Sequence, residues 1–212
     1  MTKTKRMMYM LIGILFIGIC VSSYRLSGFG VDPFTCMNLG ISSFLGISFG
    51  NWQLIMNGMI LVAVWFQVRH LVGLGTVVNM AGVGYIADFL CWLVQNQLHF
   101  SMNLPVRILL LITGTFFASL GCSLYMTADL GISPYDAVAF MIVKAVKGKI
   151  SFRVARISSD FTVMLIGVAF CLAGQNRIGQ IVGLGTLVNA LLNGPFIQFW
   201  NKRLQNKHTA MP

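Results

Sequence analysis

Eight apolar segments, separated by short polar stretches, constrain the fold of this chain more than any other feature. They lie at about residues 7–24, 33–48, 52–68 and 72–94 in the first half and 105–126, 134–148, 154–174 and 180–200 in the second. A transmembrane helix needs about 20 apolar residues, with a lower limit near 17. The first, third and fourth segments of each half meet this length, whereas the second segments, of about 16 and 15 residues, are short.

A shortage of charge places these segments in a lipid bilayer. Only 9% of the 212 residues are charged and 57% are hydrophobic, whereas a soluble domain has about 25% charged residues. This composition excludes a cytosolic enzyme, a disordered chain and a disulfide scaffold, because only a protein surrounded by lipid can expose so much apolar surface. We therefore expect an all-α, multi-pass bundle of transmembrane helices.

An internal repeat divides the chain into two homologous halves. Three sets of residues recur in order, at offsets of 101, 103 and 110: Tyr24, Gly30 and Pro33 as Tyr125, Gly131 and Pro134; Ile47–Phe49 as Ile150–Phe152; and Gly73, Gly75, Thr76 and Asn79 as Gly183, Gly185, Thr186 and Asn189. The offset grows only where loops are expected. We therefore predict two four-helix repeats within one membrane domain, over residues 7–95 and 104–200, followed by a cytoplasmic tail over 201–212.

The basic residues orient the bundle. The net charge is +10, and the basic residues lie in short clusters between apolar runs, as in cytoplasmic loops, so we do not expect nucleic acid as a partner. With both termini cytoplasmic, twelve of the fifteen Lys and Arg residues lie inside. The count is the same for eight spans, which give parallel repeats, and for six spans with re-entrant second segments, which give inverted repeats. We prefer eight, because the short segments are apolar and the basic run from Lys144 to Arg156 suits a cytoplasmic turn.

Each short segment begins with a Gly-x-x-Pro motif. The motif residues are Gly30 and Pro33 in the first half and Gly131 and Pro134 in the second. Proline suits the first position of a helix, and Asp32 or Ser133 just before it suits the N-cap. Asp136 can complete a capping box. Capping explains these residues, but the two helix starts could also face a cavity and attract an anionic group.

A second motif, Gly-Leu-Gly-Thr-x-x-Asn, opens the fourth segment of each half. We assign its small residues to close helix packing: Gly73, Gly75, Thr76, Gly183, Gly185 and Thr186. Such residues let helices approach closely, and Thr and Asn can hydrogen-bond between helices. Asn79 and Asn189 have either this structural role or a place along a central path.

An acid and a base lie one turn apart near the start of the seventh segment. Arg156 and Asp160 are neighbours on one helix face, and their repeat partners are Gln53 and Asn57. If Asp160 lies in the hydrocarbon, Arg156 is its counter-ion; if the helix begins late, both lie among the headgroups, where an ion pair contributes little. The residues that we expect to line a substrate pathway are Asp160, Arg156, Asn57, Asn79, Asn189 and Asp136.

No motif for catalysis or for a cofactor is present. The five cysteines are scattered singly, with no Cys/His cluster, so neither a metal site nor a disulfide is indicated. No Ser/His/Asp set, Glu pair or phosphate-binding loop occurs. We expect that the protein is not an enzyme and carries no cofactor or metal.

With Gly-x-x-Pro near the start of each half and Gly-Leu-Gly-Thr-x-x-Asn near its end, the chain resembles the YczE/YyaS/YitT-like bacterial membrane proteins over residues 7–200. This resemblance implies a small multi-pass protein of the bacterial cytoplasmic membrane and transfers no catalytic residues. We expect a small secondary transporter or facilitator of a small molecule or ion, with its pathway at the repeat interface. The alternative is a membrane-embedded accessory protein that regulates a partner enzyme or transport complex. Because two such repeats form a thin bundle, we also consider a homodimer.

Overall fold

The structure is a computed structural model, and it describes residues 2–98, 101–174 and 178–209. Over these residues the chain forms eight α-helices: α1 (Lys3–Ser27), α2 (Pro33–Leu45), α3 (Phe49–Val68), α4 (Leu74–Trp92), α5 (Leu104–Ala128), α6 (Pro134–Ala145), α7 (Phe152–Ala173) and α8 (Leu184–Thr209). Short turns of other helix types extend α3 at Arg69–Leu71 (η1) and α4 at Leu93–Gln97 (η2), and a third precedes α8 at Ile178–Gln180 (η3). The all-α prediction is confirmed, and α8 continues past residue 200.

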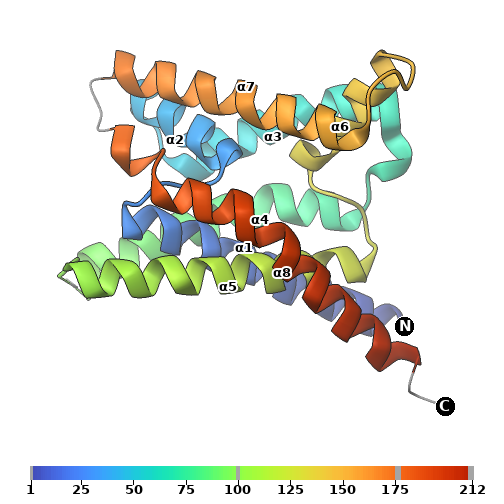
Figure 1. Ribbon diagram of the computed structural model, residues 1–212, viewed down its shortest axis with the longest axis horizontal. Helices are drawn as coiled ribbons and strands as arrows, with labels where there is room; N and C mark the ends of the chain where they lie inside the picture. The colour runs from blue at the N-terminus through green and yellow to red at the C-terminus, as the bar shows by residue number, and fades with distance from the viewer. Residues whose placement is uncertain (1, 99–100, 175–177, 210–212) are drawn as a thin grey trace.

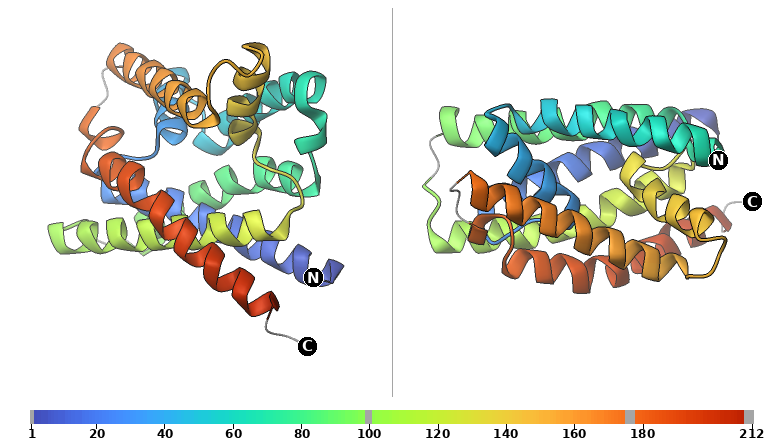
Figure 2. Two further views of the ribbon diagram at one scale, coloured as in Figure 1. Left: turned by 45° about the vertical axis from the view of Figure 1, so that its right-hand side comes forward. Right: turned by 90° about the horizontal axis from the view of Figure 1, so that it is seen from above.

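The helices form two layers (Figures 1 and 2). One layer contains α1, α4, α5 and α8, and the other contains α2, α3, α6 and α7. Five helices are long and apolar enough to cross a membrane: α1, α3 with η1, α4 with η2, α5 and α7. Large apolar side chains such as Phe66, Leu109 and Leu191 are exposed on the outside of the bundle. They cover a surface suited to lipid, because a bilayer imposes no penalty on exposed apolar groups.

The centre of the molecule is a close antiparallel pair of helices, α1 and α5. Gly13 of α1 lies against the backbone of Gly121 and Tyr125, whereas Gly114, seven residues before Gly121 on α5, lies against Ser23. A Cβ atom on Gly13 would stand 2.8 Å from the Tyr125 amide nitrogen and 2.9 Å from the Gly121 carbonyl oxygen. The backbones therefore touch, and this packing leaves no room for a pathway between α1 and α5.

The ends of the bundle can be defined by the chain ends. The start of α1 and the end of α8 lie at one end, which we call the terminal end (Figure 1). There Arg6 donates a hydrogen bond to the Ala128 carbonyl at the end of α5 over 2.8 Å. At the opposite end, the far end, Arg107 at the start of α5 donates to the Ser27 carbonyl at the end of α1 over 2.5 Å. Each central helix thus begins with an arginine that caps the other.

The two short helices do not cross the bundle. α2 has 13 residues and α6 has 12, which gives each a length of only about 20 Å or less. Phe44, near the end of α2, contacts Phe170 near the far end of α7, whereas Phe140 of α6 contacts Phe152 at the start of α7. Since α1 ends at the far end and α5 at the terminal end, each short helix begins inside the bundle and returns to the end from which the chain entered.

The preference for parallel repeats does not agree with this packing, whereas the number of spans stays a prediction. Here α2 and α6 are short helices that return to the end from which the chain entered, and we call them re-entrant (Figures 1 and 2). A parallel arrangement would make α1 and α5 run in the same direction, but they are antiparallel. Apolar composition does not distinguish the two arrangements, because a re-entrant helix buried among other helices is as apolar as a span.

Two pairs of loops connect the halves with the same hydrogen bonds. The Gly185 amide donates to the Phe29 carbonyl over 2.6 Å, and the Gly75 amide donates to the Leu130 carbonyl over 2.7 Å. In the same two places the Thr186 hydroxyl donates to the Val31 carbonyl over 2.8 Å and the Thr76 hydroxyl to the Ile132 carbonyl over 2.7 Å. The start of α2 is therefore tied to the start of α8, and the start of α6 to the start of α4.

Candidate functional site

The starts of the two re-entrant helices meet in the middle of the layer formed by α2, α3, α6 and α7. Each helix begins at the proline of its Gly-x-x-Pro motif, and the next residues, Phe34 and Tyr135, stack with ring centroids 4.3 Å apart. The Asp32 carboxylate accepts a hydrogen bond from the Thr35 amide over 3.0 Å, and the Ser133 hydroxyl accepts one from the Asp136 amide over 3.1 Å. These side chains satisfy free amides at helix ends that lie within the bundle.

A cluster of four polar side chains surrounds the start of α6. The Arg156 guanidinium lies 2.6 Å from the Asp136 carboxylate and 3.3 Å from that of Asp160, and it stands over the Tyr135 ring at 4.6 Å. The Tyr135 hydroxyl donates to Asp160 over 2.5 Å. One arginine between two carboxylates leaves a net charge of −1, held between α6 and α7. We call these four residues the charged cluster.

The charged cluster lies away from the first turn of α7. Asp160 follows the first residue of α7 by eight positions, which is about 12 Å along the helix axis. The side chains remain partly accessible, with 32% of Arg156, 49% of Asp136 and 30% of Asp160 exposed. The placement of Asp160 in the hydrocarbon stays a prediction, and a charged group there is expected to be functional.

The equivalent positions in the first half carry neutral side chains. Thr35, Gln53 and Asn57 correspond to Asp136, Arg156 and Asp160, and all three are buried, with exposed fractions of 5% or less. The Gln53 side-chain oxygen has no hydrogen-bond partner among the described residues. The two halves thus place polar groups at the same positions, but only the second half places charge there.

A cavity of about 500 Å³ reaches the charged cluster from the terminal end. Its wall combines the η1 turn and the start of α4 with the end of α5, the loop after it and Asp136. Asp136 therefore belongs both to the cavity wall and to the charged cluster. This volume is sufficient for a small organic solute or a hydrated ion.

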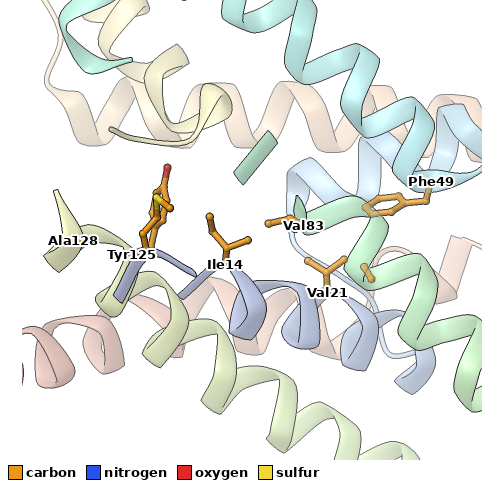
Figure 3. Packing of buried hydrophobic residues seen from close by; sticks show 8 residues of the cluster. Ile14, Val21, Phe49, Val83, Tyr125 and Ala128 are labelled. Carbon is orange, nitrogen blue, oxygen red and sulfur yellow. The ribbon is translucent and has the colours of Figure 1, made fainter. Parts of the chain in front are cut away.

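Tyr125, a residue of the cavity wall, has a buried hydroxyl group without a partner among the described residues. Tyr125 is 5% exposed, and its phenolic oxygen has no hydrogen-bond partner among the described residues. Figure 3 shows its ring beside Ile14 and its hydroxyl pointing away from the rest of the hydrophobic cluster. The equivalent residue, Tyr24, instead shares a hydrogen bond of 2.9 Å with the Thr115 hydroxyl. A buried hydroxyl is costly to leave unpaired, so the two equivalent tyrosines differ in how well they are satisfied.

The remaining pathway residues do not join this cluster. Asn57 is buried on α3, Asn79 is buried on α4, which packs on α1, and Asn189 is half-buried on α8, which packs on α5. Of the predicted pathway residues, Asp136, Arg156 and Asp160 are therefore brought together by ion pairs. Asn79 and Asn189 lie apart from them, on α4 and α8. The small residues of the second motif lie close to loops of the other half instead of forming a helix–helix stripe.

Two ion-pairing groups were missed from the sequence. Arg25 pairs with Asp88 over 2.7 Å at the far end, and Arg6 pairs with Asp129 over 3.1 Å at the terminal end. The pairing of Arg25 with Asp88 joins residues 63 positions apart, which no local pattern reveals. Arg6 and Arg107, however, are related by the repeat offset of 101, and this relation could have identified them as matching caps.

Comparison with known proteins gives relatives along nearly the whole chain. A model for a family of unknown function (DUF6198) matches residues 4–202. An uncharacterized protein of Haemophilus influenzae is 29% identical over 92% of this chain and 83% of its own length. In Bacillus subtilis, the uncharacterized protein YyaS is 26% identical over 88% of each chain, and the uncharacterized membrane protein YczE is 21% identical over 80% of this chain and 73% of its own length. No solved structure matches. The resemblance to YyaS and YczE is confirmed.

Proposed function

This chain belongs to the DUF6198 family, a family of unknown function, and we propose that it is a small secondary transporter or facilitator of a polar solute. One observation carries the proposal: the charged cluster lies inside the bundle, at the meeting point of two re-entrant helices, and borders a cavity. Secondary transporters commonly place their substrate sites where interrupted helices begin near the middle of the membrane. A protein that serves only as an anchor has no need for partly accessible charges there.

The proposed pathway lies between the two layers rather than between α1 and α5. The close backbone contact of α1 with α5 blocks the centre of that layer. The cavity instead runs between the end of α5 and the re-entrant helix α6. In this proposal the two repeats are inverted, and equivalent residues of the two halves face opposite sides of the membrane.

The positive-inside rule places the terminal end in the cytoplasm of the bacterial cell, with both chain termini inside. The basic loop that contains Lys144, Lys147 and Lys149 lies next to the end of α3, where Lys144 donates a hydrogen bond to the Gln67 carbonyl. In the six-span arrangement Arg69 lies on the cytoplasmic side with these lysines, and Arg107 lies on the outer side. The eight-span arrangement places these two arginines the other way round. The cavity then opens towards the cytoplasm.

A topology reporter tests the six-span arrangement. An alkaline phosphatase reporter fused after Asn96, at the end of η2, is expected to be active. In the six-span arrangement that position lies on the extracytoplasmic side of the membrane. Fused after Lys147, between α6 and α7, it is expected to be inactive. Inactivity at both positions would instead agree with eight spans and would contradict the proposed fold in the membrane.

Solute exchange tests the transport activity directly. Purified protein is placed in liposomes that contain an isotope-labelled small-molecule extract of the host cells, and the liposomes are transferred to unlabelled extract. We expect at least one polar solute to equilibrate faster with the wild-type protein than with D136N/D160N, because these carboxylates border the cavity. R203Q, a change near the end of α8 and outside the cavity wall, serves as the matched control and should behave as wild type.

A result in which no solute equilibrates faster with the wild-type protein than with empty liposomes would contradict transport. The accessory role would then be favoured, with the exposed basic loop of residues 144–149 as the docking surface for a partner.

A further inference from the structure

We propose that the junction of α1, α3 and α4 at the far end is the extracytoplasmic gate of the pathway, and that the equivalent junction of α5, α7 and α8 closes instead in a second state. This inference deepens the proposed function and rests on it. The far junction consists of Arg25, Gly50, Gly84 and Asp88. The terminal junction consists of the residues at the equivalent positions on α5 and α8, Met126, Gly194 and Gln198, and on α7 the position of Gly50 is taken by Arg153.

The far junction is closed by backbone contact and by charge. A Cβ atom on Gly84 would lie 2.9 Å from the Gly50 Cα atom, so α3 and α4 touch directly. The Asp88 carboxylate accepts a hydrogen bond from the Gly50 amide over 2.6 Å and pairs with Arg25 over 2.7 Å. Arg25 also stands over the Phe49 ring at 4.5 Å. One carboxylate thus joins the end of α1 and the start of α3 to α4.

The terminal junction lacks each of these contacts. A Cβ atom on Gly194 would have no neighbour within 4 Å, and Gly194 and Gln198 are both exposed. Within the described residues α7 and α8 make no contact comparable with that of α3 and α4. Met126 and Gln198 cannot form an ion pair. The terminal junction is therefore not held by the contacts that close the far junction.

The space next to each junction also differs, and at the terminal end the cavity reaches the junction at Met126. At the terminal end Tyr125, Ile132 and Asp136 line the cavity. Their equivalents at the far end are Tyr24, Val31 and Thr35, which are 0%, 0% and 2% exposed. A cavity that opens to one side, with its counterpart filled, is the geometry expected of one state of an alternating-access cycle. The present structure corresponds to the inward-open state.

Next to the far junction lies a polar side chain, that of Gln53, which would gain a hydrogen bond if α3 and α4 separated. The Gln53 side-chain oxygen lies 2.7 Å from the position of a Cβ on Gly84, and it has no hydrogen-bond partner among the described residues. A buried amide oxygen without a partner destabilises the closed arrangement. Separation of α3 from α4 would let water reach it. The Arg25–Asp88 ion pair stabilises the closed junction, and the unpaired Gln53 oxygen destabilises it. Such a balance suits a gate that must open.

Exchange of junction residues between the two ends tests this proposal. R25M/D88Q gives the far junction the residues that stand at these two positions in the terminal junction, and M126R/Q198D does the reverse. Two equivalent reporters, V31C and I132C, are placed singly in a background without the five native cysteines. Right-side-out and inside-out membrane vesicles are treated with a membrane-impermeant maleimide, and the labelling rates are compared.

In the wild-type background we expect I132C to label from the cytoplasmic side and V31C to resist labelling from outside. R25M/D88Q should raise the labelling of V31C by about fivefold or more, because a partly exposed ion pair no longer biases the two-state equilibrium. M126R/Q198D should lower the labelling of I132C. The charge-swapped variant R25D/D88R restores an ion pair and should return the labelling of V31C towards the wild-type rate.

The proposal is overturned if V31C stays equally protected in folded R25M/D88Q, or if M126R/Q198D leaves the labelling of I132C unchanged. Solute exchange that persists despite such a result would mean that transport occurs without these gates. Labelling that follows the expected pattern, without any solute exchange, would refute the proposed function and leave a protein that changes between two states.

Discussion

Replacement of Gly131 or Gly30 with alanine is expected to destabilise the fold more than any other single methyl addition that we consider. Both residues have positive φ angles, +108° and +99°, which alanine adopts only with strain. A Cβ on Gly131 would also lie 2.6 Å from the Gly73 amide nitrogen, and one on Gly30 would lie 2.5 Å from the Gly183 amide nitrogen. These contacts are with backbone atoms, which cannot move aside as a side chain can.

We expect a loss of about 3 kcal/mol or more for either substitution, the sum of left-handed strain and overpacking. Two controls separate the causes. Gly148 has φ +74° and no atom within 4 Å of its Cβ position, so G148A tests the strain alone. Gly58 lies in α3 with open space around it, and G58A should be neutral or stabilising. The measurement is the temperature at which the monodisperse peak is lost in detergent. A G131A variant as stable as G148A would contradict the tight loop contact.

Replacement of Arg156 with glutamine should have the second large effect, because it leaves two carboxylates without their counter-ion inside the membrane. Removing one partner of a buried pair costs about 3–5 kcal/mol. Since the side chains are 30–49% exposed, we expect a smaller loss, about 2 kcal/mol, for R156Q. The same detergent melting assay measures it.

The first half provides the matched control for this variant. D136T/R156Q/D160N gives the charged cluster the residues that occupy the equivalent positions in the first half, Thr35, Gln53 and Asn57. Without unpaired charge the triple variant should regain most of the stability that R156Q loses. It should still fail in solute exchange, because the charges themselves would be absent. Stability and exchange that recover together would show that the charged cluster has only a structural role.

Much of the helix organisation could be predicted from the sequence. The apolar segments gave the eight helices, and the Gly-x-x-Pro motif predicted that α2 begins at Pro33 and α6 at Pro134. Arg156 and Asp160 could be paired because residues four apart share a helix face. Asp136, twenty positions earlier, was selected as a pathway residue, but its contact with Arg156 could not be derived from helix spacing.

The direction of the short helices could not be predicted, because composition is the same for a span and for a re-entrant helix that is buried by its neighbours. Charge counting failed to decide for a related reason: Arg69 and Arg107 exchange sides between the two arrangements, so the count is unchanged. The decisive contacts are those of Gly13 with Gly121 and of Gly114 with Ser23, which join residues about a hundred positions apart.

The sequence alone determined that this chain is a helical membrane protein and where most of its helices begin, because hydrophobicity and helix-start signals are local properties of the chain. Only the tertiary structure decided that α1 and α5 are antiparallel, that Arg25 pairs with Asp88, and that a cavity opens at one end of the bundle. Those features depend on which distant segments pack together. Packing of that kind is set by the shapes and charges of whole helix faces, which no short pattern encodes.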